Sequence, residues 1–201
     1  MKKLFAVMLI MFMMQTGFAQ QAGGFRFQMD LGAAIPKDGG IGALVNLEPQ
    51  ILILDNLAFG LRLGMAGLAK DVVYTNSTED YDGDIAGNAS IVSTLNYYLN
   101  NGSSRVAPYV GAGFGYYGLS NIKIEDSNIA KEDIGDLEAA FAWAPMARAG
   151  VEVGKFRMGV EYNFIPNSNL QNVNGQVIGQ AVNKYFGFTL GFFVGGGKWG
   201  K

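Results

Sequence analysis

The amino-acid sequence predicts an all-β protein that folds as an eight-stranded antiparallel up-and-down transmembrane β-barrel. Three observations lead to this fold class. Eight segments alternate apolar residues with polar or small ones at a period of two, which is typical of strands with two different faces. The connections between these segments differ in length in a regular way. Only 16% of the 201 residues are charged while 49% are hydrophobic, so the chain has less charge than a soluble domain usually carries.

The first 19 residues are expected to form a secretory signal peptide that lies outside the fold. Lys2 and Lys3 precede an apolar run at residues 4–14, and small residues follow where a signal peptidase reads the chain. We expect cleavage after Ala19 and a barrel domain that comprises residues 20–201. The alternative is a membrane-spanning helix, which needs about 20 apolar residues. No later segment has an apolar run of that length, so a membrane would have to be crossed by strands.

The eight predicted strands share one pattern. In the seventh, every second residue from Phe156 to Phe164 is apolar, and the residues between them are polar or glycine. Pro145 lacks a backbone donor and is expected to cause a bulge in the sixth strand. The predicted strands are residues 25–35, 41–48, 57–68, 89–99, 108–120, 139–153, 156–165 and 184–194.

The connections between the strands divide into short turns and long loops. The turns are expected at residues 49–56, 100–107 and 154–155. The loops are expected at residues 70–86, 121–138 and 166–183, and the short connection 36–40 belongs to the loop set by order. In membrane barrels the short turns face the periplasm and the longer loops face outward. An even number of strands then places both termini in the periplasm.

The polar face of the strands favours a membrane barrel over a soluble one. A soluble barrel directs its apolar face inward, whereas a membrane barrel directs it toward lipid. The polar face consists mainly of small residues and of equal numbers of basic and acidic residues, which are tolerable inside a barrel when they are paired. The alternative is that these charges lie on an ordinary solvated surface. The eight predicted lumen residues, with a structural role as charge pairs, are Arg26, Asp30, Glu48, Arg62, Arg148, Glu152, Arg157 and Glu161.

One turn allows its hairpin register to be predicted. Gly154 stands first in a two-residue connection, as a type II′ turn requires. Such a turn places Glu152 opposite Arg157 and Arg148 opposite Glu161. Opposite charges that face each other directly across a ladder stabilise the pairing of the two strands.

The last predicted strand carries a family resemblance. Residues 185–193 read Tyr-Phe-Gly-Phe-Thr-Leu-Gly-Phe-Phe. With the signal peptide and the eight alternating strands, this sequence resembles the small outer-membrane β-barrel family of OmpX, OmpW and the OmpA membrane domain. The resemblance implies a location in the outer membrane of a Gram-negative bacterium, contact with outer-membrane lipid, and insertion by the barrel-insertion machinery. The last strand ends in a terminal Phe in that family, whereas this chain continues through residues 195–201.

The sequence contains no constellation typical of an enzyme. It has no histidine and no cysteine, which excludes Ser-His and Cys-His nucleophiles, disulfides and most zinc sites. We therefore expect no catalytic residue, no cofactor and no metal site. Without the signal peptide the chain has 13 basic and 17 acidic residues, and this balance does not favour nucleic-acid binding.

The long loops are the remaining candidates for function. Asp80, Asp82 and Asp84 could offer oxygen ligands to calcium, but the loop lacks the glycine and glutamate of an EF-hand, so a solvated acidic loop is the main expectation. We expect a structural or surface-interaction role through loops that meet an extracellular ligand or partner, with a lumen that side chains mostly close. Two alternatives stay open: a narrow channel or carrier for small or hydrophobic solutes, and a soluble periplasmic ligand-binding barrel.

Overall fold

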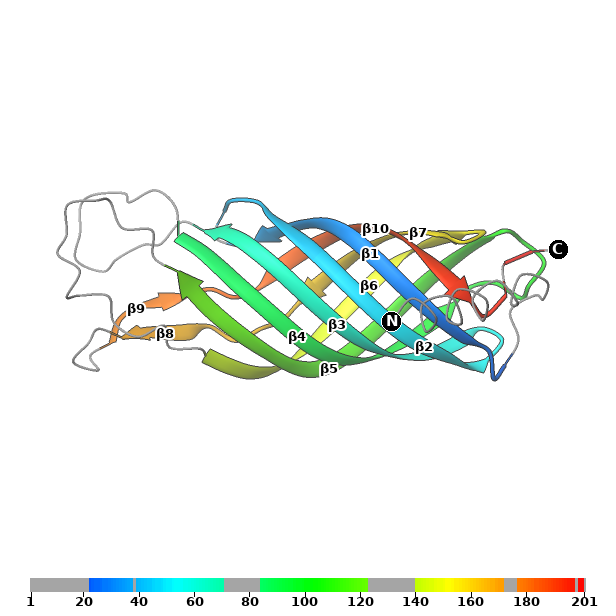
Figure 1. Cartoon of the computed structure of the whole chain (residues 1–201), viewed down its shortest axis with the longest axis horizontal. Helices are drawn as coiled ribbons and strands as arrows, with labels where there is room; N and C mark the ends of the chain where they lie inside the picture. The colour runs from blue at the N-terminus through cyan, green and yellow to red at the C-terminus, as the bar shows by residue number, and fades with distance from the viewer. Residues whose placement is uncertain are drawn as a thin grey trace, which may run out of the picture.

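The fold is a closed antiparallel barrel of eight strands, as the sequence predicts (Figure 1). The computed structural model describes residues 22–37, 39–70, 84–122, 140–171, 177–197 and 199–200. The barrel strands lie in the order β1-β10-β7-β6-β5-β4-β3-β2, and β8 and β9 form a separate two-stranded sheet. Among the described residues there is no helix long and apolar enough to cross a membrane. The barrel strands are β1 (Phe25–Pro36), β2 (Gly42–Leu54), β3 (Leu57–Lys70), β4 (Asp84–Tyr98), β5 (Val106–Ile122), β6 (Ala140–Val153), β7 (Phe156–Asn163) and β10 (Tyr185–Gly195).

The two ends of the barrel differ. At one end, which we call the turn end, β1 begins, β10 ends, and the connections after β2, β4 and β6 are short. The opposite end, which we call the loop end, carries the connections after β1, β3, β5 and β7. The turn end lies on the right of Figure 1 and the loop end on the left. Pairing of β1 with β10 from Arg26↔Gly195 to Pro36↔Tyr185 closes the barrel.

Several strands are longer than the sequence pattern predicts. The predicted turn at 49–56 contracts to Asp55 and Asn56, because β2 continues to Leu54. Pro49 does not end the strand, since it stays in register with Phe27 of β1. At the loop end, β4 begins within the predicted loop 70–86 and β5 extends into the predicted loop 121–138.

The bulge predicted at Pro145 is wrong. Pro145 pairs with Phe114 in an unbroken register between β5 and β6. The ladder of β6 with β7 ends at Met146, so the missing N–H of the proline lies just beyond it. A register shift is found instead between Leu52 and Leu54 of β2.

The predicted loop 166–183 also contains structure that its polar composition does not suggest. Its flanks form the antiparallel hairpin of β8 (Ser168–Gln171) and β9 (Val177–Ala181), beyond the loop end of the barrel in Figure 1. Backbone pairing satisfies the N–H and C=O groups of these flanks. The predicted signal peptide, Asp80, Asp82 and most of the loops 70–86 and 121–138 lie outside the described residues, and Asp84 begins β4.

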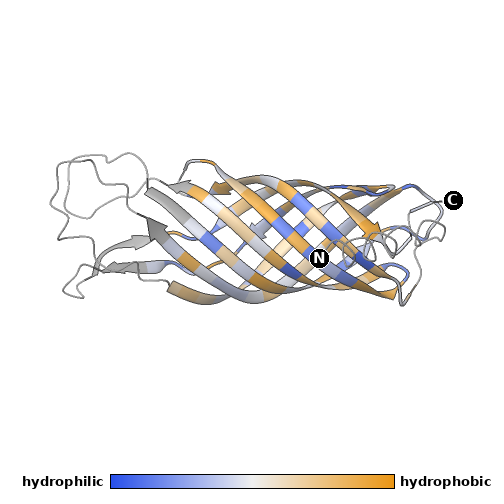
Figure 2. Ribbon diagram, in the orientation of Figure 1, coloured by the Kyte–Doolittle hydropathy of each residue, from blue (hydrophilic) through white to orange (hydrophobic). Residues whose placement is uncertain are grey.

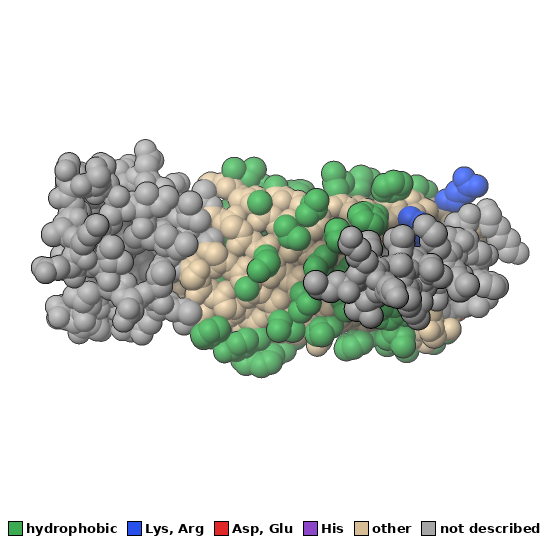
Figure 3. Space-filling model, viewed as in Figure 1, with side chains coloured by type: hydrophobic (Ala, Val, Ile, Leu, Met, Phe, Trp, Pro, Cys, Tyr) green, Lys and Arg blue, Asp and Glu red, His purple; other side chains and the backbone are tan. Residues whose placement is uncertain are grey.

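The outer surface of the barrel is apolar. All eight barrel strands carry large exposed hydrophobic side chains, among them Trp143 at 62% and Phe156 at 73% exposure. Figure 2 shows hydrophobic and hydrophilic residues alternating along the strands, and Figure 3 shows hydrophobic side chains distributed over the visible face of the barrel. Soluble monomers rarely expose contiguous apolar patches of more than a few hundred Å². The apolar residues of the alternating pattern therefore point outward, as expected of a membrane barrel.

The hairpin of β6 and β7 has the predicted register. Glu152 lies opposite Arg157, and Arg148 lies opposite Glu161. Gly154 has a φ of +64°, and no residue other than glycine has a positive φ in the described chain, which is the pattern of a type II′ turn. A glycine at the first turn position thus sets the register that places these oppositely charged residues opposite each other.

Replacing Gly154 with alanine is expected to lower the free energy of unfolding by about 1–3 kcal/mol, because a side chain there must adopt the left-handed region. Denaturant titration of the refolded protein in detergent micelles measures the effect. Gly67→Ala is the matched control, since Gly67 has an ordinary φ and an added Cβ would meet no atom within 4 Å. Equal losses in the two variants would contradict the turn assignment.

Candidate functional site

The lumen contains the eight charged residues selected from the sequence. All are buried, with exposed fractions of at most 6%. Four are arginines and four are carboxylic acids, so their formal charges cancel. Neutrality matters here because an unpaired charge in a narrow protein interior is costly. They come from β1, β2, β3, β6 and β7, namely Arg26, Asp30, Glu48, Arg62, Arg148, Glu152, Arg157 and Glu161.

Glu152 is the centre of the network nearest the turn end. Its carboxylate lies 3.2 Å from Arg26 Nη1 and 3.1 Å from Arg157 Nη1. It also accepts hydrogen bonds from the Tyr98 hydroxyl at 3.0 Å and from Trp199 Nε1 at 2.6 Å. The carboxylate of Glu152, on β6, therefore links β1, β4, β7 and the C-terminal tail.

A second cluster joins β2 to β6 across the lumen. Arg148 forms a bidentate salt bridge with Glu48, with Nη1–Oε2 and Nη2–Oε1 distances of 2.6 Å each. Arg148 Nε donates to Asn96 Oδ1 at 2.7 Å. Glu48 also accepts bonds from Gln50 at 2.7 Å and from Thr94 at 2.5 Å. Bidentate hydrogen bonds between an arginine and a carboxylate are among the strong polar contacts that side chains make.

A third cluster lies nearer the loop end. Arg62 Nη1 is 2.7 Å from Glu161 Oε1, and Arg62 Nη2 donates to Asn163 Oδ1 at 2.9 Å. The Tyr117 hydroxyl donates to Asn163 Oδ1 at 2.8 Å, and Asn46 Nδ2 donates to Glu161 Oε2 at 3.4 Å. This cluster connects β2, β3, β5 and β7.

The ion pairs differ in part from those that the hairpin register suggests. Glu152 does bind Arg157, its neighbour across the ladder. Arg148 and Glu161 are also neighbours, but Arg148 binds Glu48 and Glu161 binds Arg62. The inward side chains cross the lumen to the opposite wall, which a single hairpin cannot reveal.

Asp30 is an exception among the eight predicted charge partners. Within the described chain it lies in no ion pair, and its Oδ2 accepts a hydrogen bond from Gln28. The sequence did not predict the side-chain amides that donate hydrogen bonds to these carboxylates, such as Gln28 to Asp30 and Asn163 to Glu161. The only feature of the sequence that could have identified them is their place on the inward face of the strands.

Apolar layers fill the lumen on both sides of the charged network. The turn-end layer contains Leu52, Ala58, Tyr98, Ala107, Tyr109, Phe193 and Trp199. The loop-end layer contains Ala34, Leu44, Ala66, Leu68, Val92, Tyr117, Leu119, Ala144, Met146, Ile165 and Tyr185. The charges thus lie between two layers of buried apolar side chains along the barrel axis.

The C-terminal tail closes the turn end. Residues 195–197 are glycines with φ values of 79°, 61° and 76°, which turn the chain back toward the barrel mouth. Trp199 is only 2% exposed, and its ring lies 5.0 Å from that of Tyr98. Lys155 Nζ donates to the carbonyls of Gly195 and Gly197. This plug was not predicted, because one tryptophan in a glycine-rich tail has no periodicity.

This arrangement offers little for catalysis or metal binding. The carboxylates of Glu48, Glu152 and Glu161 each contact an arginine, so none is available as a free base. In the described part of the chain, no group of three or more acidic residues could hold a metal ion. The chemistry of the lumen is that of internal charge neutralisation.

Solved structures with the same fold include small bacterial barrels. The chain is similar to Neisserial surface protein A, with 16% identity and a TM-score of 0.54, over 86% of this chain and 97% of that one. It is also similar to the outer membrane protein OprG from Pseudomonas aeruginosa, with 14% identity and a TM-score of 0.61, over 88% and 97% of the two chains. No protein-family model and no curated protein sequence matches the chain. At these identities the likeness shows the fold.

Replacing Glu152 with alanine is expected to lower the free energy of unfolding by about 3–5 kcal/mol, because it leaves Arg26 and Arg157 buried without their shared carboxylate. Unfolding in urea and detergent micelles, followed by circular dichroism, measures the loss. Asp55→Asn, an exposed acidic position at the turn end, should change stability by less than about 0.5 kcal/mol. A small effect at Glu152 would show that the network does not stabilise the barrel.

Replacing Trp199 with phenylalanine is expected to cost about 1.5–3 kcal/mol, since it keeps an aromatic ring but removes the donor to a charged carboxylate. Trp143→Phe changes the same atoms on the outer face, where Trp143 is 62% exposed, and should cost less. The same denaturant titration compares both variants. A larger loss for Trp143→Phe would contradict the role of the tail as a plug.

Proposed function

We propose that this chain is an outer-membrane protein whose barrel is a closed anchor and whose loop end carries a structural or surface-interaction role. The observation that carries this proposal is the filled lumen. Segments 70–86, 121–138 and 166–183 are then the parts that meet an extracellular ligand or a surface partner. Both termini lie in the periplasm.

The outer face of the barrel supports a membrane location. Every barrel strand presents large apolar side chains outward, and the eight charged residues selected from the sequence lie inside. A chain in hydrocarbon must bond every backbone group internally, which a closed barrel does. A soluble periplasmic barrel would have to expose this surface to water. Outer-membrane lipid and the barrel-insertion machinery are therefore the partners that we propose.

The lumen argues against a channel. Eight strands enclose a space that side chains can fill. Arg148 and Glu48 span it with two bonds of 2.6 Å, and Trp199 lies buried at the turn end. A solute on this path would have to break these buried ion pairs. We assign a structural role to the eight charged residues and no catalytic role to any residue.

The absence of cysteine allows the orientation to be tested with two matched variants. Ser77→Cys lies in the segment 70–86, and Ser103→Cys lies in the exposed connection between β4 and β5. We expect a membrane-impermeant maleimide to label Ser77→Cys in intact cells, and to label Ser103→Cys only after the outer membrane is permeabilised. Both variants should sediment with outer membranes and show heat-modifiable gel migration.

The opposite labelling pattern would reverse the proposed orientation. Recovery of the protein in the soluble periplasmic fraction would contradict the membrane location. In planar bilayers the purified protein should give no resolvable conductance steps. Regular steps would favour the narrow channel instead.

A further inference from the structure

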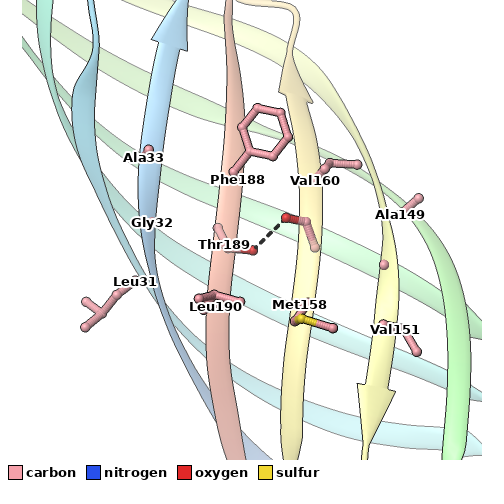
Figure 4. A pocket seen from close by; sticks show the side chains of 12 residues that line it. Leu31, Gly32, Ala33, Ala149, Val151, Met158, Val160, Phe188, Thr189 and Leu190 are labelled. Atoms are coloured by element: carbon pink, nitrogen blue, oxygen red, sulfur yellow. Dashed lines mark hydrogen bonds between the residues drawn. The ribbon is translucent and has the colours of Figure 1, made fainter.

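An apolar groove crosses the outer face of four adjacent strands (Figure 4). It lies over β1, β10, β7 and β6 and has a volume of about 720 Å³. Its floor follows one cross-strand row in which Gly32 pairs with Thr189 and Thr189 with Gly159. The Thr189 hydroxyl donates to the carbonyl of Gly159 at 3.4 Å, so it is not left unsatisfied beside the groove.

Two rows of outward apolar side chains form the walls of this groove. On the loop-end side, Ala33 pairs with Phe188, which pairs with Val160. On the turn-end side, Leu31 pairs with Leu190, which pairs with Met158. Figure 4 shows Phe188 and Val160 on one side of the floor and Leu190 and Met158 on the other. The walls of the groove are therefore suited to an apolar ligand.

Two lysines stand directly opposite each other at the loop end of the same strands. The backbone N–H of Lys37 donates to the carbonyl of Lys184 at 3.1 Å, which continues the register of β1 with β10 beyond both strand ends. Both positions continue the outward face, since they follow exposed Ile35 and precede exposed Phe186 by two residues. In the described ranges, neither ammonium forms an ion pair with a carboxylate.

Lys37 and Lys184 carry the same charge at paired positions of the two strands. Like charges directly opposite each other across a ladder destabilise it. A phosphate group placed between Lys37 and Lys184 would remove this repulsion through charge-assisted hydrogen bonds. The lysine pair therefore indicates a ligand with a negatively charged group, and the groove indicates that the ligand also has an apolar portion.

The groove and the lysine pair lie on the same two strands, β1 and β10. Gly32 and Thr189 each lie five residues from the lysine of their own strand, which is about 17 Å along an extended strand. Aromatic side chains lie beside this path, with Tyr162 4.4 Å from Phe186 between ring centroids. Aromatic residues are enriched at the headgroup level of membrane proteins.

We propose that a phosphate-bearing membrane lipid docks on this face, with its headgroup on Lys37 and Lys184 and an acyl chain in the groove. The inference rests on the proposed membrane location, and in the proposed orientation the lipid belongs to the outer leaflet. Charge complementarity selects this occupant over a second copy of the chain, which would bring the lysine pairs of two barrels together.

Binding to the refolded full-length protein in detergent tests the headgroup site. The probes are bisphosphorylated lipid A and dephosphorylated lipid A, with complexes counted by native mass spectrometry. We expect the phosphorylated lipid to bind the protein, and the double variant K37Q/K184Q to bind it about thirtyfold more weakly, at about 1 kcal/mol for each lysine. Lys70→Gln, at the loop end of β3 and away from the groove, is the matched charge control and should bind within about twofold of the unaltered protein.

The groove is tested with a second matched pair. Ala33→Phe places a ring in the groove and should weaken binding, whereas Ala112→Phe is an exposed position on β5 that does not line it. Equal binding of the two lipid A forms, or unchanged binding by K37Q/K184Q, would overturn the headgroup site. Equal binding by the two phenylalanine variants would overturn the acyl-chain groove.

Heat-modifiable migration of every variant shows that the barrel is folded and separates lost binding from misfolding. The result can also be separated from that of the proposed function. If the cysteine-labelling variants show the proposed orientation while lipid binding ignores the lysines, this inference alone fails. If the protein is a soluble periplasmic barrel, both fail.

Discussion

Pairing of β1 with β10 is the interaction on which the rest of the structure depends. It joins the first barrel strand to the last and leaves every barrel strand with a neighbour on each side. Once the sheet is closed, each side chain lies either in the lumen or on the outer face, and a slip of one residue would exchange the two sets. The separation of charge from apolar surface therefore follows from closure and register. A closed sheet also satisfies the backbone where no water is available.

Closure makes the lumen narrow, and its narrowness determines the chemistry inside. Charged side chains from opposite walls meet within bonding distance, as Arg148 does with Glu48 and Arg62 with Glu161. Such pairs are strongly coupled to the fold because removing one partner leaves a buried charge. Apolar layers lie on both sides of the network, and Trp199 belongs to the layer at the turn end. The same contacts that hold the walls together also fill the path through the lumen.

The parts of the structure that sequence could predict are those set by local periodicity. Alternation identified all eight barrel strands and their inward face, and Gly154 predicted the register of one hairpin. The partner of Arg148 could not be predicted in this way, because Glu48 reaches it only when the barrel closes. The end of β2 was predicted too early, at residue 48, because Pro49 was taken to end the strand. The β8–β9 hairpin and the Trp199 plug lack an apolar period, so nothing in the local pattern distinguished them from loop and tail.

The two tryptophans report on the two faces of the barrel and allow the central claim to be measured directly. Trp143 is 62% exposed on the outer face and Trp199 is 2% exposed at the turn end. Single-tryptophan variants W199F and W143F, refolded into vesicles, can be exposed to lipids brominated on their acyl chains and to aqueous iodide. The structure predicts that brominated lipids quench Trp143 while iodide quenches neither residue. Quenching of Trp143 by iodide, without quenching by brominated lipid, would show that the apolar face lies in water and would contradict the membrane barrel.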